Sequence, residues 1–490
     1  MKILLLNAPF KAQHGRFSRA QRSPAITKGG TLYYPFGLCS IAGVLEADGF
    51  GVKIVDAPAR RLGLAEVRRL VLEFQPRLLI LDTSTPSIQS DAAVAGELGA
   101  LSGAVTVLIG THPSALPEQT LRLDPRIDAV VRREPEYAVL DLARMLRDGP
   151  SPHASEMLRD VAGLSLRLGG EIVHTPDRPY IDDLDQLPFL SRVYREHLRI
   201  RDYFYTIAQY PQVAIFSARG CPHHCAYCLY PQVLHGHRVR KRSVENLIAE
   251  LQYIERHIPE VREVVIEDDT FTIDRRRLLD FTAAYRRAAL SLSWIANSRA
   301  DVELDVLRQL KASNCRLLCV GFESGDQAVL DKLGKRLELE RAVRFARDAR
   351  RVGILIHGCF LVGGPGETPH TMDRTLALAK SLPLDTAQFF PLMVYPGTQA
   401  YAWAKESGYL RTEDFSKWNT DQGLHDCVVS RPGLDSEDLV AFCNRARREF
   451  YARPGYLLYR LRRLATHPAQ DGPRMWRSLR VFHRHLLRWP

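Results

Sequence analysis

Short apolar runs alternate with longer segments of helical periodicity through the first 150 residues. Nearly continuous apolar runs at 3–6, 52–55, 78–81, 105–109 and 129–131 predict strands that are buried on both faces. Between them, apolar residues recur every three or four positions and predict helices at about 37–47, 64–74, 90–101, 116–123 and 137–147. The alternation predicts an α/β domain over residues 1–150 with a doubly wound, Rossmann-like parallel sheet.

Polar and turn residues follow the ends of these strands. In doubly wound sheets, ligands bind at the carboxyl ends of the strands. No G-x-G-x-x-G follows the first strand, so a dinucleotide is not expected. The candidate ligand-binding residues at this edge are Asn7, Asp56, Ser84, Thr85, Gly110 and His112.

A second alternating pattern covers residues 206–400. Apolar runs at 213–216, 263–266, 293–296, 316–320, 354–360 and 386–393 are separated by helical segments, and six βα repeats predict a partial (β/α)6 barrel. Residues 151–205 are predicted to be a connector that contains a hairpin, with strands at 164–168 and 171–174 around Gly169-Gly170. Residues 401–490 are predicted to form a basic, mainly helical extension.

Three cysteines lie close together directly after the first barrel strand. Cys221, Cys225 and Cys228 have the spacing C-x3-C-x2-C, which indicates a metal site. Three thiolates are one fewer than usually close a zinc or iron–sulfur site, which suggests a cluster with one open iron. A zinc loop with His223 or His224 as fourth ligand is the alternative. The six other cysteines, expected to be buried apolar side chains, are Cys39, Cys315, Cys319, Cys359, Cys427 and Cys443.

This spacing, with Tyr227 before the last cysteine, resembles the radical S-adenosylmethionine (SAM) superfamily. The resemblance implies that the three cysteines are the catalytic metal ligands of a [4Fe-4S] cluster. The open iron would bind SAM, and one electron from the cluster would release a 5′-deoxyadenosyl radical.

Motifs at the later strand ends extend the resemblance. Glu267-Asp-Asp269 follows the second barrel strand, and the family places such carboxylates near the SAM amino group; an acidic helix N-terminus is the alternative. The segment Gly363-Gly-Pro-Gly-Glu367 looks like the family's adenine-contacting loop. The residues that the resemblance assigns to SAM are Tyr227, Asp268, Asp269, Ser298, Arg299, Glu323, Gly363, Gly364 and Tyr395.

Together with the cysteine motif, the first domain resembles the cobalamin-binding domains that precede many radical SAM domains. The turn at 110–113 and the Ser/Thr-rich loop at 82–87 match their cofactor-binding loops. The D-x-H-x-x-G motif, whose histidine ligates cobalt in other cobalamin proteins, is absent, so no histidine lower ligand is expected. The alternative is a domain that binds nothing, or only protein.

The whole resemblance implies a class B cobalamin-dependent radical SAM methyltransferase. Such an enzyme uses [4Fe-4S], SAM and cobalamin to methylate an unactivated carbon of a small-molecule or lipid-like substrate, with a flavodoxin or ferredoxin as electron donor. An oxidative, ring-forming cyclase with the same cofactors is the alternative, and a cobalamin-binding regulator is the non-enzyme alternative. A methylthiotransferase is disfavoured, because the first domain has no second cysteine triad.

Positive charge concentrates at the carboxyl end of the chain. The net charge is +11, and from residue 444 onward twelve arginines face two acidic residues, Glu449 and Asp471. Basic helical patterns at 456–464 and 475–489 suggest either a capping helix pair or contact with an anionic membrane; nucleic acid is disfavoured. A cytoplasmic protein is expected, with contact at the inner membrane face left open. The basic run Arg238–Arg242 is expected to face solvent or a partner.

Overall fold

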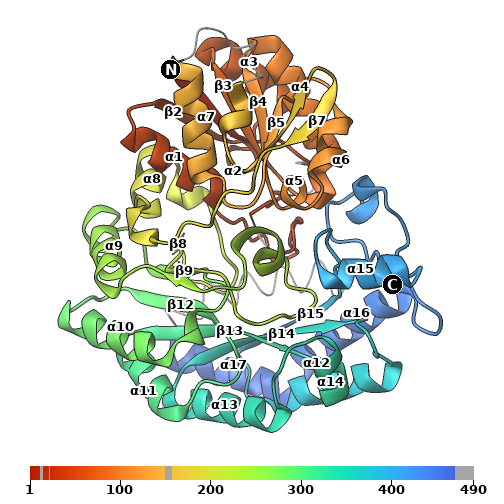
Figure 1. The fold of residues 1–490 in the computed structure, drawn as a ribbon. Coiled ribbons are helices and arrows are strands. Elements are labelled where there is room, and N and C mark those ends of the chain that lie inside the picture. Colours follow the sequence, from red (N-terminus) through yellow and green to blue (C-terminus); the bar gives the residue numbers. More distant parts are fainter. Residues whose placement is uncertain (12–14, 21, 149–156, 469–490) are drawn as a thin grey trace.

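Two sheets, the first mainly and the second entirely parallel, lie one above the other (Figure 1). The structure is a computed structural model that describes residues 1–11, 15–20, 22–148 and 157–468. The first sheet has the strand order β2-β1-β3-β4-β5-β6-β7. Its parallel part consists of β1 (Lys2–Asn7), β2 (Gly51–Asp56), β3 (Leu78–Thr83), β4 (Val105–Gly110) and β5 (Ala129–Val131). The predicted doubly wound sheet is confirmed.

Helices cover both faces of this sheet because its strands are apolar on both sides. Every position of β3 is buried. The α1 helix packs on α7, while α3 and α4 pack together. The helices of this half are α1 (Phe36–Ala47), α2 (Ala57–Arg60), α3 (Leu64–Phe74), α4 (Ile88–Ser102), α5 (Thr111–Ala115), α6 (Pro117–Leu123) and α7 (Glu136–Asp148).

The predicted hairpin is present and extends the first sheet. Strands β6 (Leu164–Leu168) and β7 (Glu171–His174) pair antiparallel, and β6 also pairs antiparallel with β5. The helix α8 (Leu190–His197) then packs against α1 and leads the chain into the second sheet.

The second sheet is fully parallel, with the order β15-β14-β13-β12-β11-β8. An open row of six parallel strands with helices on its outer side confirms the partial (β/α)6 barrel (Figure 1). Its strands are β8 (Gln212–Ile215), β11 (Glu263–Ile266), β12 (Ser293–Ser298), β13 (Cys315–Glu323), β14 (Leu355–Val362) and β15 (Thr386–Pro391); β9 (Ala218–Arg219) and β10 (Arg240–Lys241) form a separate ribbon. Its helices are α9 (Val244–His257), α10 (Arg275–Arg287), α11 (Leu304–Ala312), α12 (Gln327–Lys332), α13 (Leu339–Val352) and α14 (Pro369–Ser381).

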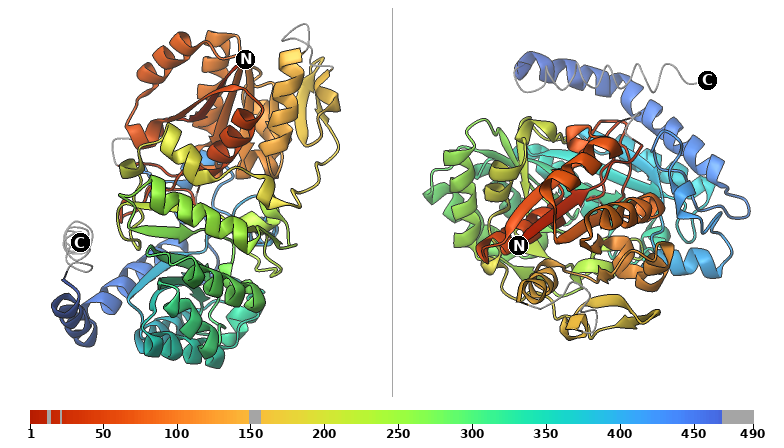
Figure 2. Two further views of the ribbon diagram at one scale, coloured as in Figure 1. Left: turned by 90° about the vertical axis from the view of Figure 1, so that its left-hand side faces the viewer. Right: turned by 90° about the horizontal axis from the view of Figure 1, so that it is seen from above.

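Three helices follow the barrel: α15 (Gln399–Glu406), α16 (Ser436–Ala452) and α17 (Pro454–Thr466). The α16 helix packs on β15, and α17 continues along the outside of the barrel (Figure 2). In the described part of the chain, no helix combines the length and the apolar character that a bilayer crossing requires. The second predicted tail helix, at 475–489, lies outside the described residues.

Buried ion pairs hold the first domain on the cysteine loop of the barrel. The carboxylate of Glu134, just after β5, accepts two hydrogen bonds of 2.8 Å from Arg240 and lies 3.3 Å from Arg219. The expectation that the run Arg238–Arg242 faces solvent or a partner is therefore wrong for Arg240, whose side chain is 2% exposed. Arg242 is also buried, on Glu250, because a guanidinium can leave water when a carboxylate meets it.

We expect Glu134→Gln to destabilise the protein by about 3 kcal/mol, because it leaves the buried guanidinium of Arg240 without its counter-charge, whereas Arg219 keeps its pair with Glu136. Thermal and urea unfolding followed by circular dichroism would measure the change. The matched control is Glu118→Gln, which breaks an exposed pair with Arg122 and should cost under about 1 kcal/mol. Equal losses in the two variants would contradict this role of Glu134.

Candidate functional site

The three motif cysteines lie on a loop whose backbone is fixed by hydrogen bonds. Cys221 and Cys225 are buried and Cys228 is partly exposed. The side-chain amide of Gln232 donates to the carbonyls of Cys225, Ala226 and Cys228, at 3.2, 3.2 and 2.8 Å. The amide of Ala226 donates to the carbonyl of Leu333 at 2.9 Å. The loop is therefore tied to the barrel before any ligand binds.

The electrostatics of the loop favour a thiolate at Cys225, whereas burial raises the pKa of Cys221. The hydrogen bond from Cys228 and the nearby ammonium of Lys335 lower the pKa of Cys225 to about 6, although burial opposes this shift. The same hydrogen bond raises the pKa of Cys228, so this pair shares one proton. Thiolates are the form that binds metal, and this loop therefore suits a metal cluster.

The spread of the three sulfurs fits a cluster better than a single ion. A zinc ion with Zn–S bonds of about 2.3 Å would need sulfurs no more than about 4.6 Å apart. Among the described residues, the groups whose ligand atoms all lie within 4.8 Å of one another do not include this triad. Three thiolates on one loop are a ligand set that iron–sulfur clusters use.

The acidic residues after β11 anchor this loop. The carboxylate of Asp268 accepts from the amides of Ser217 and Ala218, at 2.6 and 3.0 Å. Asp269 accepts from the amide of Gly220 at 3.0 Å and lies 2.9 Å from His235 Nδ1. Burial alone would raise the pKa of Asp269, but His235 and Arg22 outweigh burial and lower it to about 2. Both side chains are thus buried at the predicted strand end and position the loop.

Arg22 joins this acidic group from the N-terminal segment, and the sequence gives no pattern that would reveal it. Its guanidinium lies 3.1 Å from Glu267 Oε2 and 3.5 Å from Asp269 Oδ1. Within the described chain, Glu267 Oε1 and Asp269 Oδ1 are buried without a hydrogen bond. Two such acceptors fit the ammonium donor that SAM would supply.

Glu323 forms a buried ion pair beside the cysteine loop. Lys335 Nζ lies 2.8 Å from Glu323 Oε1 and 3.4 Å from the hydroxyl of Tyr227. Sequence reasoning missed Lys335, since only its position in the fold brings it to this strand end. Arg299 donates to the carbonyls of Lys335 and Arg336, at 2.9 and 2.8 Å, and therefore fixes the same turn. The predicted residues Tyr227, Arg299 and Glu323 are thus brought together around Lys335. The hydroxyl of Ser298, by contrast, forms a hydrogen bond of 3.0 Å with the hydroxyl of Thr272.

The glycine segment after β14 passes close to neighbouring side chains. Gly363 has a φ of +95°, and a Cβ on Gly364 would lie 2.9 Å from Leu333. Glu367 at the end of the segment is buried, and burial raises its pKa to about 7. The hydroxyl of Tyr395 lies 3.1 Å from Ser23 Oγ of the N-terminal segment. The glycines thus let the backbone pass close to Leu439 and Leu333, and the adenine contact stays a prediction.

At the edge of the first sheet, Asn7 and Asp56 belong to a buried network. Asn7 donates to Asp56 at 2.9 Å, and the hydroxyl of Tyr203 donates to Asp56 at 2.8 Å. Arg19 donates to Asn7 at 2.7 Å and pairs with Asp91. The structure thus gives these two predicted residues protein partners, and Arg19 and Tyr203 are additions that sequence reasoning missed.

The other predicted residues of this edge line its centre. Ser84, Thr85 and His112 are all at most 2% exposed. Burial lowers the pKa of His112 to about 3, so the imidazole is neutral. Its Nε2 is buried without a hydrogen bond among the described residues, while Nδ1 lies 3.3 Å from Thr85 Oγ1. Gly110, with a φ of +116°, allows the strand to turn into α5. The hydroxyls and the unpaired nitrogen fit a polar cofactor at this edge.

The two candidate edges face each other across the domain boundary. Tyr230, two residues after the last motif cysteine, is an electrostatic neighbour of both Asp82 at the end of β3 and Asp269 of the barrel. Phe415 packs edge-on against His112, and Trp418 lies 6.0 Å from the ring of Tyr395. The loop that carries these two aromatics therefore bridges the two sites.

Two family models match the chain at these two sites. The model of the radical SAM superfamily matches residues 215–379, and that of the B12 binding domain matches residues 22–143. The chain is a radical SAM enzyme with a B12-binding domain. The matched ranges contain the cysteine loop and most of the sheet edge described above.

Similar proteins span both domains. An uncharacterized methyltransferase of Pyrococcus horikoshii is 29% identical over 94% of each chain. An anaerobic magnesium-protoporphyrin IX monomethyl ester cyclase of Rubrivivax gelatinosus is 25% identical over 87% of this chain and 75% of that protein. The radical SAM methyltransferase TsrM of Kitasatospora setae, solved with cobalamin and a [4Fe-4S] cluster, is 17% identical with a TM-score of 0.68, covering 91% and 90% of the two chains. At this identity, the structural likeness shows the shared fold.

The raised pKa of Glu367 predicts a pH-dependent stability. Its folded-state pKa of about 7 lies above the ordinary 4.5, so its contribution is complete below about pH 4.5 and is lost as the pH rises through 7. We expect the wild type to lose on the order of 3 kcal/mol over this window relative to Glu367→Gln. Urea unfolding at a series of pH values measures this difference. The exposed Glu340→Gln should follow the wild type; parallel curves for wild type and Glu367→Gln would refute the assignment.

Proposed function

We propose that this enzyme is a cobalamin-dependent radical SAM methyltransferase that methylates an unactivated carbon of a small-molecule or lipid-like substrate. The observation that carries the proposal is the pair of facing edges, with the cysteine loop on one and Ser84, Thr85 and His112 on the other. A methyl donor on the first sheet would then face a radical formed in the barrel. The methyltransferase relatives of similar length support the same chemistry.

In this proposal, each edge holds its own cofactor. Cys221, Cys225 and Cys228 would hold the [4Fe-4S] cluster, and the sheet edge would hold cobalamin. When bound, these groups and SAM supply a carbon-centred radical and a transferable methyl group. Glu267 and Asp269 would orient the SAM amino group, and Lys335 keeps the charge of Glu323 balanced beside the cluster.

The cyclase alternative keeps the same cofactors without methyl transfer. Its support is the similarity to magnesium-protoporphyrin IX monomethyl ester cyclases over most of the chain. Turnover that yields S-adenosylhomocysteine together with 5′-deoxyadenosine would favour methylation, whereas 5′-deoxyadenosine alone would favour cyclisation.

The first experiment is to measure iron and corrinoid in protein made anaerobically with cobalamin supplied. We expect about four irons and one corrinoid per chain, and an EPR signal of the reduced cluster that shifts on addition of SAM. Cys225→Ala should lose most of the iron and keep the corrinoid, because the two sites lie on different sheets. The control Cys443→Ala, at a buried cysteine of α16, should keep both. Wild-type protein without cluster or without corrinoid would overturn the proposal.

Two partners accompany the proposed reaction. An electron donor such as flavodoxin or ferredoxin would reduce the cluster. An anionic membrane surface is the second, because α17 exposes Leu457, Leu458 and Leu461, which are 50%, 69% and 60% exposed, beside the exposed Arg462. A helix that exposes leucines together with cationic side chains can bind an anionic membrane surface.

Liposome flotation tests the membrane partner. We expect the full-length protein to float with anionic vesicles at low salt and to release at high salt, since screening weakens each cationic contact. Leu458→Ser with Leu461→Ser should reduce flotation severalfold. The control Leu101→Ser, on the exposed surface of α4, should leave flotation unchanged. A wild type that remains with the soluble fraction at low salt would rule out this partner.

A further inference from the structure

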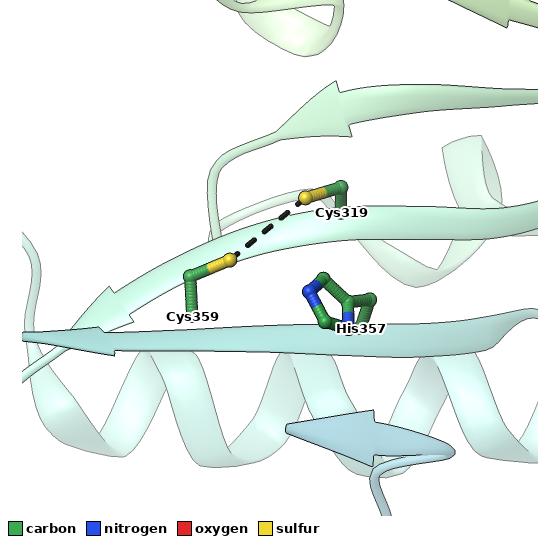
Figure 3. A group of neighbouring side chains, drawn as sticks. All are labelled: Cys319, His357 and Cys359. Atoms are coloured by element: carbon green, nitrogen blue, oxygen red, sulfur yellow. Dashed lines mark hydrogen bonds between the residues drawn. The ribbon is translucent and has the colours of Figure 1, made fainter. Parts of the chain in front are cut away.

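Two cysteines outside the motif, Cys319 of β13 and Cys359 of β14, lie together with His357 (Figure 3). The two sulfurs are 3.9 Å apart, and all three ligand atoms lie within 4.8 Å of one another. The expectation that these two cysteines are buried apolar side chains is wrong, because both are partly exposed. The other four cysteines outside the motif are buried, as expected.

Strand register produces this cluster. Cys319 pairs with His357 across β13 and β14, and Cys359 lies two positions further along β14, on the same face of the sheet. The residues that alternate with them along the strands point to the other face of the sheet. There, Phe360 stacks between Phe322 and Phe389. A packed aromatic layer behind the strands therefore fixes the three ligand side chains on the inner face.

The inner face is open where the cluster lies. Along β13 only Cys319 and Gly321 are partly exposed, and along β14 only Cys359 is. Gln388 on β15, which pairs with Cys359, is exposed in the same row. Gly321, two positions after Cys319 on the same face, lies directly beside the Glu323–Lys335 pair, because a Cβ on Gly321 would lie 2.8 Å from Lys335 Nζ.

We infer that Cys319, His357 and Cys359 form a second metal site for a zinc-like divalent ion, with its fourth position open to the barrel interior. Two sulfurs on a tetrahedral zinc, each about 2.3 Å from the ion, lie about 3.8 Å apart, close to the observed 3.9 Å. Thiolate and imidazole ligands suit zinc rather than magnesium or calcium. Three protein ligands with one open position are the arrangement of catalytic, not structural, zinc sites.

The histidine is oriented for this role. Its Nδ1 lies 2.7 Å from the hydroxyl of Thr386 on β15, and Figure 3 shows the other ring nitrogen turned toward the sulfurs. Metal-binding histidines commonly have such an oxygen partner, which fixes the ring. Thr386 is therefore a positioning residue for His357.

The open position gives the ion a function within the barrel. Cys319 is an electrostatic neighbour of Tyr33 and Tyr205, whose rings lie 5.1 Å apart, and Cys359 is a neighbour of Glu323 and Lys335. The ion thus lies between the SAM pocket and this tyrosine pair. It would bind an oxygen or sulfur donor of the substrate and hold that substrate near the radical; this last step rests on the proposed function, whereas the metal site does not.

Zinc analysis of the anaerobic holoenzyme tests the site. With zinc supplied, we expect about one zinc per chain in addition to iron, and zinc-edge X-ray absorption with two sulfur neighbours and one nitrogen neighbour. Cys359→Ala and His357→Ala should lose the zinc at unchanged iron content, which also serves as the folding control. Cys443→Ala should keep both metals. Cys225→Ala should lose iron and keep zinc, so failure of the cluster and failure of this site are distinguished.

A graded variant tests the geometry. Thr386→Val should weaken zinc binding about 10- to 100-fold, because it removes the hydrogen-bond partner that orients His357. Thr386→Ser should bind zinc as the wild type does. The inference is overturned if the wild type binds no zinc, or if peptide mapping finds Cys319 and Cys359 joined as a disulfide. It is also overturned if Cys359→Ala keeps its zinc, or if Cys225→Ala loses its zinc together with the iron.

Discussion

The buried carboxylate of Glu134 is the contact on which the arrangement of the two sites depends. It follows β5, the last parallel strand of the first sheet, and it meets Arg219 and Arg240, which flank the cysteine loop on both sides. Arg219 also pairs with the buried Glu136 at 2.6 Å, so four charges are buried together, and an unpaired buried ion would cost several kcal/mol. This group of buried charges therefore fixes the loop that would carry the cluster relative to the edge that would carry cobalamin.

The same principle recurs inside the site. Asp269 is met by Arg22 and His235, and Glu323 is met by Lys335, so each buried carboxylate already has a protein cation. Preformed pairs of this kind fix side chains before a ligand arrives, which lowers the reorganisation needed on binding. A charged ligand such as SAM would then meet two acceptors, Glu267 Oε1 and Asp269 Oδ1, that lack a hydrogen bond among the described residues.

The strands, the helices and the cysteine motif could be predicted because their information is local. Strands of a buried parallel sheet are continuous apolar runs, so β3 and β11 begin where the sequence indicates, and polar residues mark their ends. Arg22 could not be predicted, because it lies in a segment without periodicity. Arg240 was misassigned because a run of basic residues looks the same whether it faces water or buried carboxylates of another domain. Local pattern carries no information about which charges meet.

The two cysteine clusters of the barrel differ in whether the sequence alone reveals them. The triad is visible in the sequence because a loop brings its three sulfurs together, and a loop can spread them around a multi-iron cluster. Cys319, His357 and Cys359 come from two strands, and only the register between β13 and β14 brings them within reach of one ion. Rigid strands hold two sulfurs at the separation that a tetrahedral ion requires. Loop and sheet would thus select different metals from the same ligand type, and this geometric difference would keep iron and zinc apart within one barrel.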